Sequence, residues 1–312
     1  MKPLRPDHVV RSSTWWRSLM RAYPLIAILS ALIVGVGLTA LAQADPSADA
    51  KSVRAYFQKK FPKVPYDQYA NGLYALPGNE EYRIQWEIMN EFPAYEIGLD
   101  EGRKLWNTPF SNGKTWASCF KNGGVKIAQH YPYWDKATQK VRTMEMDLID
   151  CAARNGATEL AASWSDLDAD DKKERVQLAN LTAYVYSLSR GERIDIDLSD
   201  PGAQKAFEEG KKFWWAKRGQ LNFACADCHV VLSGKNMGGN QPLSAALGHP
   251  VGWPAQRAGW GRLETLHYRY MTCNSQVRAK PFKHGSEIYN NLQLYETYIS
   301  NGLPLTAPAL RN

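Results

Sequence analysis

The chain has 312 residues, of which 44% are hydrophobic and 22% charged, a composition typical of folded globular proteins and not of disordered chains. Its formal net charge is +7, and the first 44 residues, with five basic and one acidic side chain, contribute +4 of it. The remaining charge of +3 is too small to indicate a nucleic-acid partner.

Residues 1–44 have the pattern of an export signal. A basic stretch that ends at Arg21 precedes an apolar run from Leu25 to Leu41, and Ala42-Gln43-Ala44 matches a signal-peptidase cleavage site. No two arginines are adjacent in this stretch, which favours a Sec-type route. We therefore expect a cleaved signal peptide and a periplasmic protein. Because the apolar run is at the short limit for a membrane span, an uncleaved anchor is the alternative.

Three sequence blocks occur twice in the same order along the rest of the chain. The matching pairs are Asp100–Trp106 with Glu208–Trp214, Pro132–Cys151 with Pro254–Cys273, and Asn180–Gly191 with Asn291–Gly302. The first and third pairs have helical apolar spacing, and the third pair ends in a glycine that would stop a helix. We therefore predict a mainly α-helical protein with two tandem domains, here called the first repeat (45–190) and the second repeat (203–312), joined by an Asp-rich linker (191–202).

A complete cofactor-attachment motif is present in the second repeat. Cys225-Ala226-Asp227-Cys228-His229 is a C-x-x-C-H sequence, in which both thiols form thioethers with haem and the histidine binds the iron. A zinc site would need a second pair of ligands, and a thioredoxin-like pair would follow a strand. An amphipathic helix, expected over 203–217, precedes this motif instead. We therefore predict one covalently bound haem c in the second repeat. Because the two repeats are similar, we expect both to be cytochrome c-like domains, the first without haem.

The first repeat has Cys119 at the corresponding place, but no C-x-x-C-H follows it. Cys119 and Cys151 therefore have no haem to bind. In an oxidising compartment we expect them to form a disulfide, which would stabilise the repeat by about 3–4 kcal/mol by restricting the unfolded chain. Two free buried thiols are the alternative.

Cys273 is the remaining cysteine, with neither a thioether nor a disulfide partner. A thiol that stays free in an oxidising compartment is best explained as a metal ligand or a nucleophile. We therefore favour Cys273 as the second axial ligand of the iron, where a thiolate would lower the reduction potential. Arg269 lies one helical turn earlier and would hold an anionic substrate, bind a haem propionate or lie on the surface. Spacing leaves four other candidate ligands open: Met237, His249, His267 and Met271.

The duplicated domain, the single C-A-D-C-H motif and the R-x-x-x-C segment from Arg269 to Cys273 together resemble the SoxA family, the larger cytochrome subunits of SoxAX complexes. The resemblance covers nearly all of the chain after residue 44. It implies an L-cysteine S-thiosulfotransferase, which couples thiosulfate oxidatively to a cysteine of a SoxYZ-like carrier and passes electrons through haem. A small SoxX-like cytochrome would be the heterodimer partner.

The same resemblance assigns roles to two residues. It implies that Cys273 is both the distal haem ligand and the catalytic thiol, and that Arg269 binds thiosulfate. Members of the family differ in haem number, and this chain looks like the one-haem type. The competing prediction is a simple electron-transfer cytochrome with Met271 or a histidine as distal ligand and a higher reduction potential.

Overall fold

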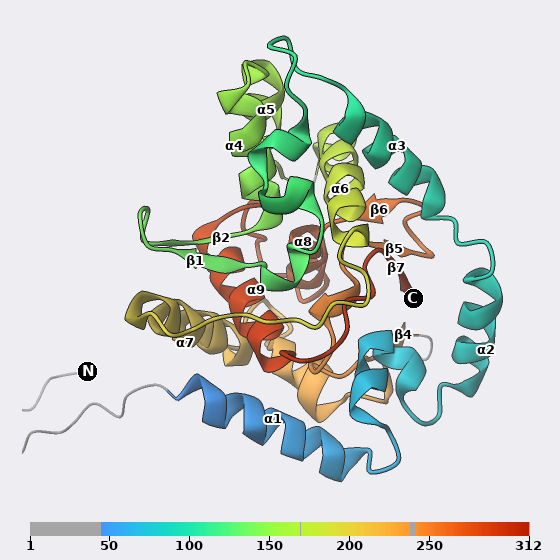
Figure 1. The fold of residues 1–312 in the computed structure, drawn as a ribbon. Coiled ribbons are helices and arrows are strands. Elements are labelled where there is room, and N and C mark those ends of the chain that lie inside the picture. Colours follow the sequence, from blue (N-terminus) through green and yellow to red (C-terminus); the bar gives the residue numbers. More distant parts are fainter. Residues whose placement is uncertain (1–44, 169, 238–240, 312) are drawn as a thin grey trace, which may run out of the picture. The chain divides into compact units, whose positions relative to one another are not determined.

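The computed structural model describes residues 45–168, 170–237 and 241–311 (Figure 1). The predicted signal peptide lies outside these residues. No helix in the described ranges is both long and apolar enough to cross a membrane. The described residues all belong to one compact unit.

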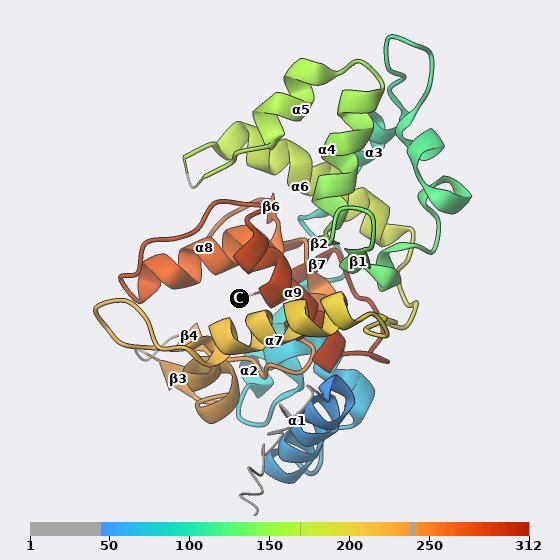
Figure 2. The same ribbon diagram turned by 90° about the vertical axis from the view of Figure 1, so that its left-hand side faces the viewer.

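Helices dominate the structure, as predicted. The α-helices are α1 (Pro46–Lys60), α2 (Glu80–Met89), α3 (Glu96–Asn107), α4 (Met144–Arg154), α5 (Thr158–Trp164), α6 (Lys172–Ser187), α7 (Pro201–Trp215), α8 (Leu266–Gln276) and α9 (Glu287–Ile299). The helices of 3₁₀ type are η1 (Tyr66–Ala75), η2 (Trp116–Cys119), η3 (Lys121–Gly124), η4 (Ala128–His130) and η6 (Pro250–Gly252), and η5 (Asp227–Val231) is a π-helix. In the turned view, α9 lies between α7 and α8 (Figure 2).

The strands are short and form three small sheets. Strands β1 (Tyr133–Asp135) and β2 (Lys140–Arg142) pair antiparallel, as do β3 (Asn236–Met237) and β4 (Gln241–Pro242). In the third sheet, β5 (Ala255–Arg257) pairs antiparallel with β6 (Leu263–Glu264) and parallel with β7 (Ala309–Arg311). The C-terminal strand is thereby held inside the second repeat.

Both repeats contain the same crossing of two helices. α3 packs on α6, and α7 packs on α9 (Figures 1 and 2). A Cβ added to Gly102 would lie 2.0 Å from the carbonyl oxygen of Asn180, and one added to Gly210 would lie 2.0 Å from that of Asn291. These residues are the matching positions of the repeated blocks. The sequence repeat therefore corresponds to a repeated close approach of two backbones, which only glycine permits.

The matching threonines also have the same role in both repeats. Thr143 begins α4 by accepting a hydrogen bond from the backbone N–H of Met146, and Thr265 begins α8 by accepting one from Tyr268. A capped helix therefore follows a strand pair in each repeat and carries Cys151 or Cys273 in its last turns.

α7 begins two residues before the predicted helix over 203–217 and also ends two residues earlier. The side chain of Asp200 caps its first turn by accepting from the N–H of Gly202, and Pro201 occupies the first helical position. At the other end, Ala216 has extended backbone angles that stop the helix. Local capping thus sets boundaries that the apolar pattern could not locate.

Cys119 and Cys151 form the predicted disulfide, with their Cα atoms 5.9 Å apart. It lies in a hydrophobic core that runs through both repeats. Large buried side chains of this core include Trp116 and Trp164 from the first repeat and Trp214 from the second.

Candidate functional site

The C-x-x-C-H segment borders a cavity of about 300 Å³ in the second repeat. Cys225 lies in the helical turn that leads into η5, and Cys228 and His229 lie in η5 itself. The cavity is mostly apolar and therefore suits a large hydrophobic ligand. Side chains that provide this apolar wall include Trp214, Leu221, Phe223, Leu243, Val277 and Leu292.

His229 has the form that an iron ligand needs. Its Nδ1 lies 3.1 Å from the carbonyl oxygen of Ser244, a geometry in which Nδ1–H donates and Nε2 keeps its lone pair. Burial, with a smaller effect from the neighbouring His249, lowers the pKa of His229 to about 3. The imidazole is therefore neutral over the physiological pH range, as metal ligation requires.

The two motif cysteines are uncharged thiols in this environment. Burial raises the pKa of Cys225 to about 12, and burial also raises the pKa of Cys228. Within the described ranges, no group of three or more His, Cys, Asp or Glu side chains has an arrangement suited to a metal ion alone. The pocket therefore fits a covalently attached, largely apolar group such as haem better than a zinc ion.

Arg269 and Cys273 open into the same cavity. Both lie on α8, four residues apart, and therefore on the same helix face. Arg269 is 8% exposed, and its Nη1 has no hydrogen-bond partner in the described part of the chain. Cys273 is a free, half-buried thiol. The cavity thus combines a thiol with a buried guanidinium that can still bind an anion.

The structure separates the other candidate iron ligands. Met271 and His267 are buried and do not line the cavity, whereas Met237 and His249 do. The ring centroids of His249 and His229 are 4.5 Å apart, so the rings are in contact and leave no space for an iron between them. Of the cavity-lining candidates, Cys273 and Met237 remain.

The chain has close relatives of known name. A family model described as the cytochrome c domain of SoxA/TsdA matches residues 101–194. L-cysteine S-thiosulfotransferase subunit SoxA of Allochromatium vinosum is 42% identical over 270 residues, which cover 86% of this chain and 91% of the relative. The SoxA subunit of Chlorobaculum tepidum is 41% identical over 269 residues, covering 86% and 89%. The chain belongs to the SoxA family.

A solved structure agrees with this assignment. The crystal structure of SoxXA from P. pantotrophus superposes with a TM-score of 0.59 and 25% sequence identity, covering 70% of this chain and 79% of that chain. The SoxA/TsdA match falls largely in the first repeat, which has no C-x-x-C-H motif. The first repeat is therefore a cytochrome c domain by family as well as by its internal similarity to the second.

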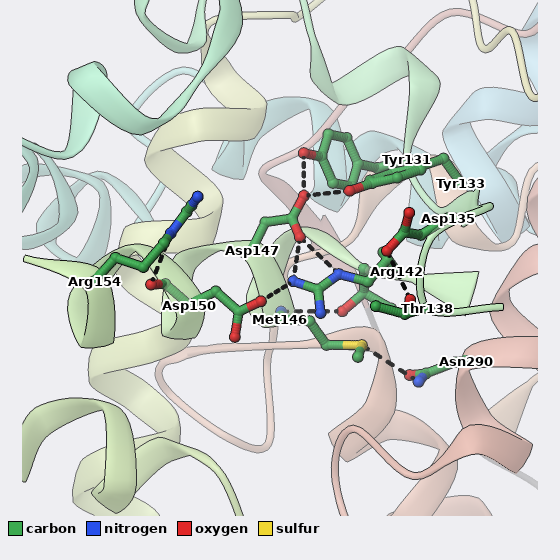
Figure 3. A network of polar contacts seen from close by, with 11 residues as sticks. Tyr131, Tyr133, Asp135, Thr138, Arg142, Met146, Asp147, Asp150, Arg154 and Asn290 are labelled. Carbon is green, nitrogen blue, oxygen red and sulfur yellow. Dashed lines mark hydrogen bonds and ion pairs between the residues drawn. The ribbon is translucent and has the colours of Figure 1, made fainter. Parts of the chain in front are cut away.

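In the first repeat, the position that matches Arg269 belongs to a network of polar contacts (Figure 3). Counting from the capping threonines, Asp147 corresponds to Arg269. Asp147 accepts hydrogen bonds from Arg142 Nε at 2.9 Å, from Tyr131 Oη at 2.6 Å and from Tyr133 Oη at 3.1 Å. Its carboxylate is fully satisfied by the protein, and nothing is left to bind a ligand.

The second repeat has the opposite charges at these positions and pairs them differently. Glu264 corresponds to Arg142, but it accepts from Arg175 Nη2 at 3.0 Å and from Arg262 Nε at 2.8 Å. Arg269 is therefore not neutralised by the glutamate at the equivalent position. This rearrangement leaves its guanidinium free to face the cavity.

Sequence reasoning missed a buried network beside His229. Glu296 is fully buried, its Oε1 lies 2.9 Å from Nδ1 of His249, and its Oε2 accepts a hydrogen bond from Tyr270. Burial raises the pKa of Glu296 to about 7. The one available signal was that Glu296 is the one charged side chain of α9 after its first residue. Its partners are distant in sequence, so no spacing pattern could identify them.

Proposed function

We propose that this SoxA-family chain is an L-cysteine S-thiosulfotransferase subunit that couples thiosulfate oxidatively to a cysteine of a SoxYZ-like carrier. The observation that carries the proposal is that Arg269 and Cys273 open into the same cavity as the C-x-x-C-H segment. In this proposal Cys225 and Cys228 attach one haem c, His229 and Cys273 are the iron ligands, and Cys273 is the catalytic thiol.

Arg269 binds the substrate. Thiosulfate is a dianion, and a guanidinium with an unpartnered Nη1 can donate two parallel hydrogen bonds to its sulfonate oxygens. Arg269 lies one helical turn from Cys273, so this contact holds the outer sulfur of thiosulfate beside the thiol. Proximity of this kind lowers the barrier to a bimolecular step.

The reaction then takes two steps. The outer sulfur of thiosulfate forms an S–S bond with the thiolate Sγ of Cys273, and two electrons are released. The thiolate of the carrier cysteine then attacks that sulfur, the bond to Cys273 breaks, and Cys273 is returned as a thiolate. Haem c held by Cys225, Cys228 and His229 would supply the one-electron redox chemistry that this oxidation needs. His229 stays neutral throughout because it is buried and donates to Ser244.

The proposed partners follow from this chemistry. The electrons need an acceptor, and the SoxXA structure among the similar folds supports a small SoxX-like cytochrome as heterodimer partner. The sulfur unit needs a carrier cysteine, which a SoxYZ-like protein would present at the cavity. The export signal predicted over residues 1–44 would bring the chain to the periplasm.

The test compares Cys273→Ala with Ser275→Ala, a control at an exposed position on the same helix. Cys273→Ala should retain covalent haem but lose thiosulfate-dependent electron release by on the order of 10³-fold or more, because the reacting sulfur is gone. The ferric haem spectrum should lose its thiolate signature at the same time. Ser275→Ala should behave as the unmodified protein in both measurements.

The competing function is a simple electron-transfer cytochrome, and Met237 at the cavity wall is the observation that favours it. In that case Cys273→Ala would leave both electron release and the ferric spectrum intact. Met237→Leu would instead remove the axial ligand and change the spectrum. This pair of results would overturn the proposed sulfur chemistry.

A further inference from the structure

A second, smaller cavity of about 50 Å³ adjoins the first and shares His229, His249 and Arg269 with it. Three arginines line this second cavity: Arg257 from β5, Arg269 from α8 and Arg311 from β7. Among the described residues, no Asp or Glu contributes to its wall. A concentration of positive charge next to the C-x-x-C-H cavity therefore has no acidic counterpart in the wall.

Two of these arginines are neighbours in the sheet. Arg257 and Arg311 are register partners in the parallel pairing of β5 with β7, so their side chains emerge side by side on one face. Like charges placed opposite each other on adjacent strands are destabilising unless another group neutralises them. The pairing would be favourable if an anion lay between or beside the two guanidinium groups.

The backbone around Arg311 makes room for its side chain. Arg311 Nη2 donates to the carbonyl oxygen of Ala70 at 3.0 Å, and Nη1 donates to that of Leu310 at 3.3 Å. A Cβ on Gly252 would lie 2.2 Å from Nη2, and Gly72 has a left-handed φ of 64° where a Cβ would lie 3.5 Å from Nε. These contacts hold the guanidinium of Arg311 in place at the cavity wall.

The charges of Arg257 and Arg311 also favour a bound anion. Burial, reinforced by the nearby Arg269, lowers the pKa of Arg257 to about 10, and burial lowers that of Arg311 to about 10. Both groups are still cationic at neutral pH. Two adjacent cations in one cavity wall repel each other, and an anion bound beside them would reduce this repulsion.

We propose that Arg257 and Arg311 bind the propionate carboxylates of the haem attached at Cys225 and Cys228. Haem carries its two carboxylates on one edge of an otherwise apolar ring, and an apolar cavity that adjoins a paired-arginine cavity matches that division. Arg269, which lines both cavities, then remains available to bind thiosulfate. The inference rests on the haem of the proposed function and not on its sulfur chemistry.

The experiment uses the full chain with covalent haem, in the variants Arg257→Gln and Arg311→Gln. The thioethers keep the haem attached even when a propionate contact is lost, and haem content measured as the pyridine haemochrome verifies this. Arg83→Gln is the control, because it removes one positive charge from an exposed position on α2. The readouts are the midpoint potential at one pH and ionic strength and the resonance Raman propionate-bending band.

Both Gln variants should shift the propionate band and lower the midpoint potential, since removing a nearby cation favours ferric over ferrous haem. Arg311→Lys keeps the charge but not the planar fork, so it should shift the band with a smaller change in potential. It also provides a milder substitution if Arg311→Gln does not fold.

Two results would overturn the proposal. In the first, the Gln and Lys variants keep the unmodified propionate band and their potentials change no more than that of Arg83→Gln. In the second, the band is unchanged but the KM for thiosulfate rises, which would make the arginine pair a substrate site. Neither result bears on Cys273, whose variant tests the proposed function separately.

Discussion

Single residues make the difference between the two repeats. Cys151 and Cys273 occupy matching positions, yet Cys151 is bonded to Cys119 and Cys273 is a free thiol beside a cavity. Asp147 is neutralised within the first repeat, whereas Arg269 keeps an unpartnered Nη1. The two copies of the repeated fold thus differ at matching positions: the first has a disulfide and a neutralised carboxylate, and the second has a free thiol and an arginine at a cavity.

Glu296 predicts a pH-dependent contribution to stability. Its pKa is raised to about 7 in the folded protein, chiefly by burial, so between about pH 4.5 and pH 7 it is protonated when folded and ionised when unfolded. The free energy of unfolding should therefore fall as pH rises through this window, by up to about 3 kcal/mol. Glu296→Gln, which is always neutral, should lack this contribution.

The measurement is urea unfolding of both proteins at pH 5 and pH 8. The free energy of unfolding of Glu296→Gln minus that of the unmodified protein should be larger at pH 8 than at pH 5. For the exposed control Glu159→Gln, this difference should be the same at both pH values. A difference between the two proteins that stays constant with pH would contradict the assignment of a raised pKa to Glu296.

At the scale of elements, each repeat depends on one helix crossing at a glycine. α3 meets α6 at Gly102, and α7 meets α9 at Gly210. The second crossing matters for the site, because the segment that follows α7 carries Cys225 and α9 carries Glu296. The distance between these two helices therefore helps to set the geometry of the cavity wall.

Gly210→Ala should destabilise the protein by about 1–3 kcal/mol. The added Cβ would lie 2.0 Å from a backbone oxygen of Asn291, and this overpacking exceeds the gain of about 1 kcal/mol in helix propensity. Gly102→Ala should cause a similar loss of stability at the equivalent crossing. Chemical denaturation measures the free energy of unfolding of both variants.

Gly259→Ala is the matched control for this comparison. No atom lies within 4 Å of the position that its Cβ would take, so its stability should change little. If Gly210→Ala were as stable as Gly259→Ala, the helices would not be in the close contact described.

At the scale of the whole molecule, a buried ion pair connects the two repeats. Arg175 of α6 and Glu264 of β6 are 2% and 0% exposed and make two hydrogen bonds, of 3.0 and 3.3 Å. The guanidinium carbon of Arg175 also lies 4.0 Å from the ring centroid of Tyr268. This contact fixes α6 of the first repeat against the end of the strand that precedes α8.

Glu264→Gln should destabilise the protein by about 3 kcal/mol, because it removes the carboxylate charge that accepts two hydrogen bonds from the buried guanidinium of Arg175. The double variant Arg175→Gln/Glu264→Gln should recover part of this loss. Asp67→Asn, which breaks an ion pair between exposed side chains, is the control and should have little effect. Urea unfolding of the unmodified protein, of the single variants Arg175→Gln and Glu264→Gln, and of the double variant gives the coupling energy. Strictly additive effects would show that the pair is not coupled.

Features that depend on short spacing or on chain order can be predicted from the amino-acid sequence. The C-x-x-C-H segment is contiguous because both thiols and the histidine must reach one haem. The duplication is visible because repeated blocks keep their order, and from it follow the mainly helical fold, the lack of a haem motif in the first repeat and the pairing of Cys119 with Cys151.

The side chains that meet around the cavity could be identified only from the folded chain. It brings Glu296 to His249, places Arg257 beside Arg311, and turns Met271 and His267 away from the cavity. It also pairs Glu264 with Arg175, so that Glu264 does not form an ion pair with Arg269. These contacts join residues from different elements, and packing over the whole second repeat sets their geometry, which no local sequence pattern encodes.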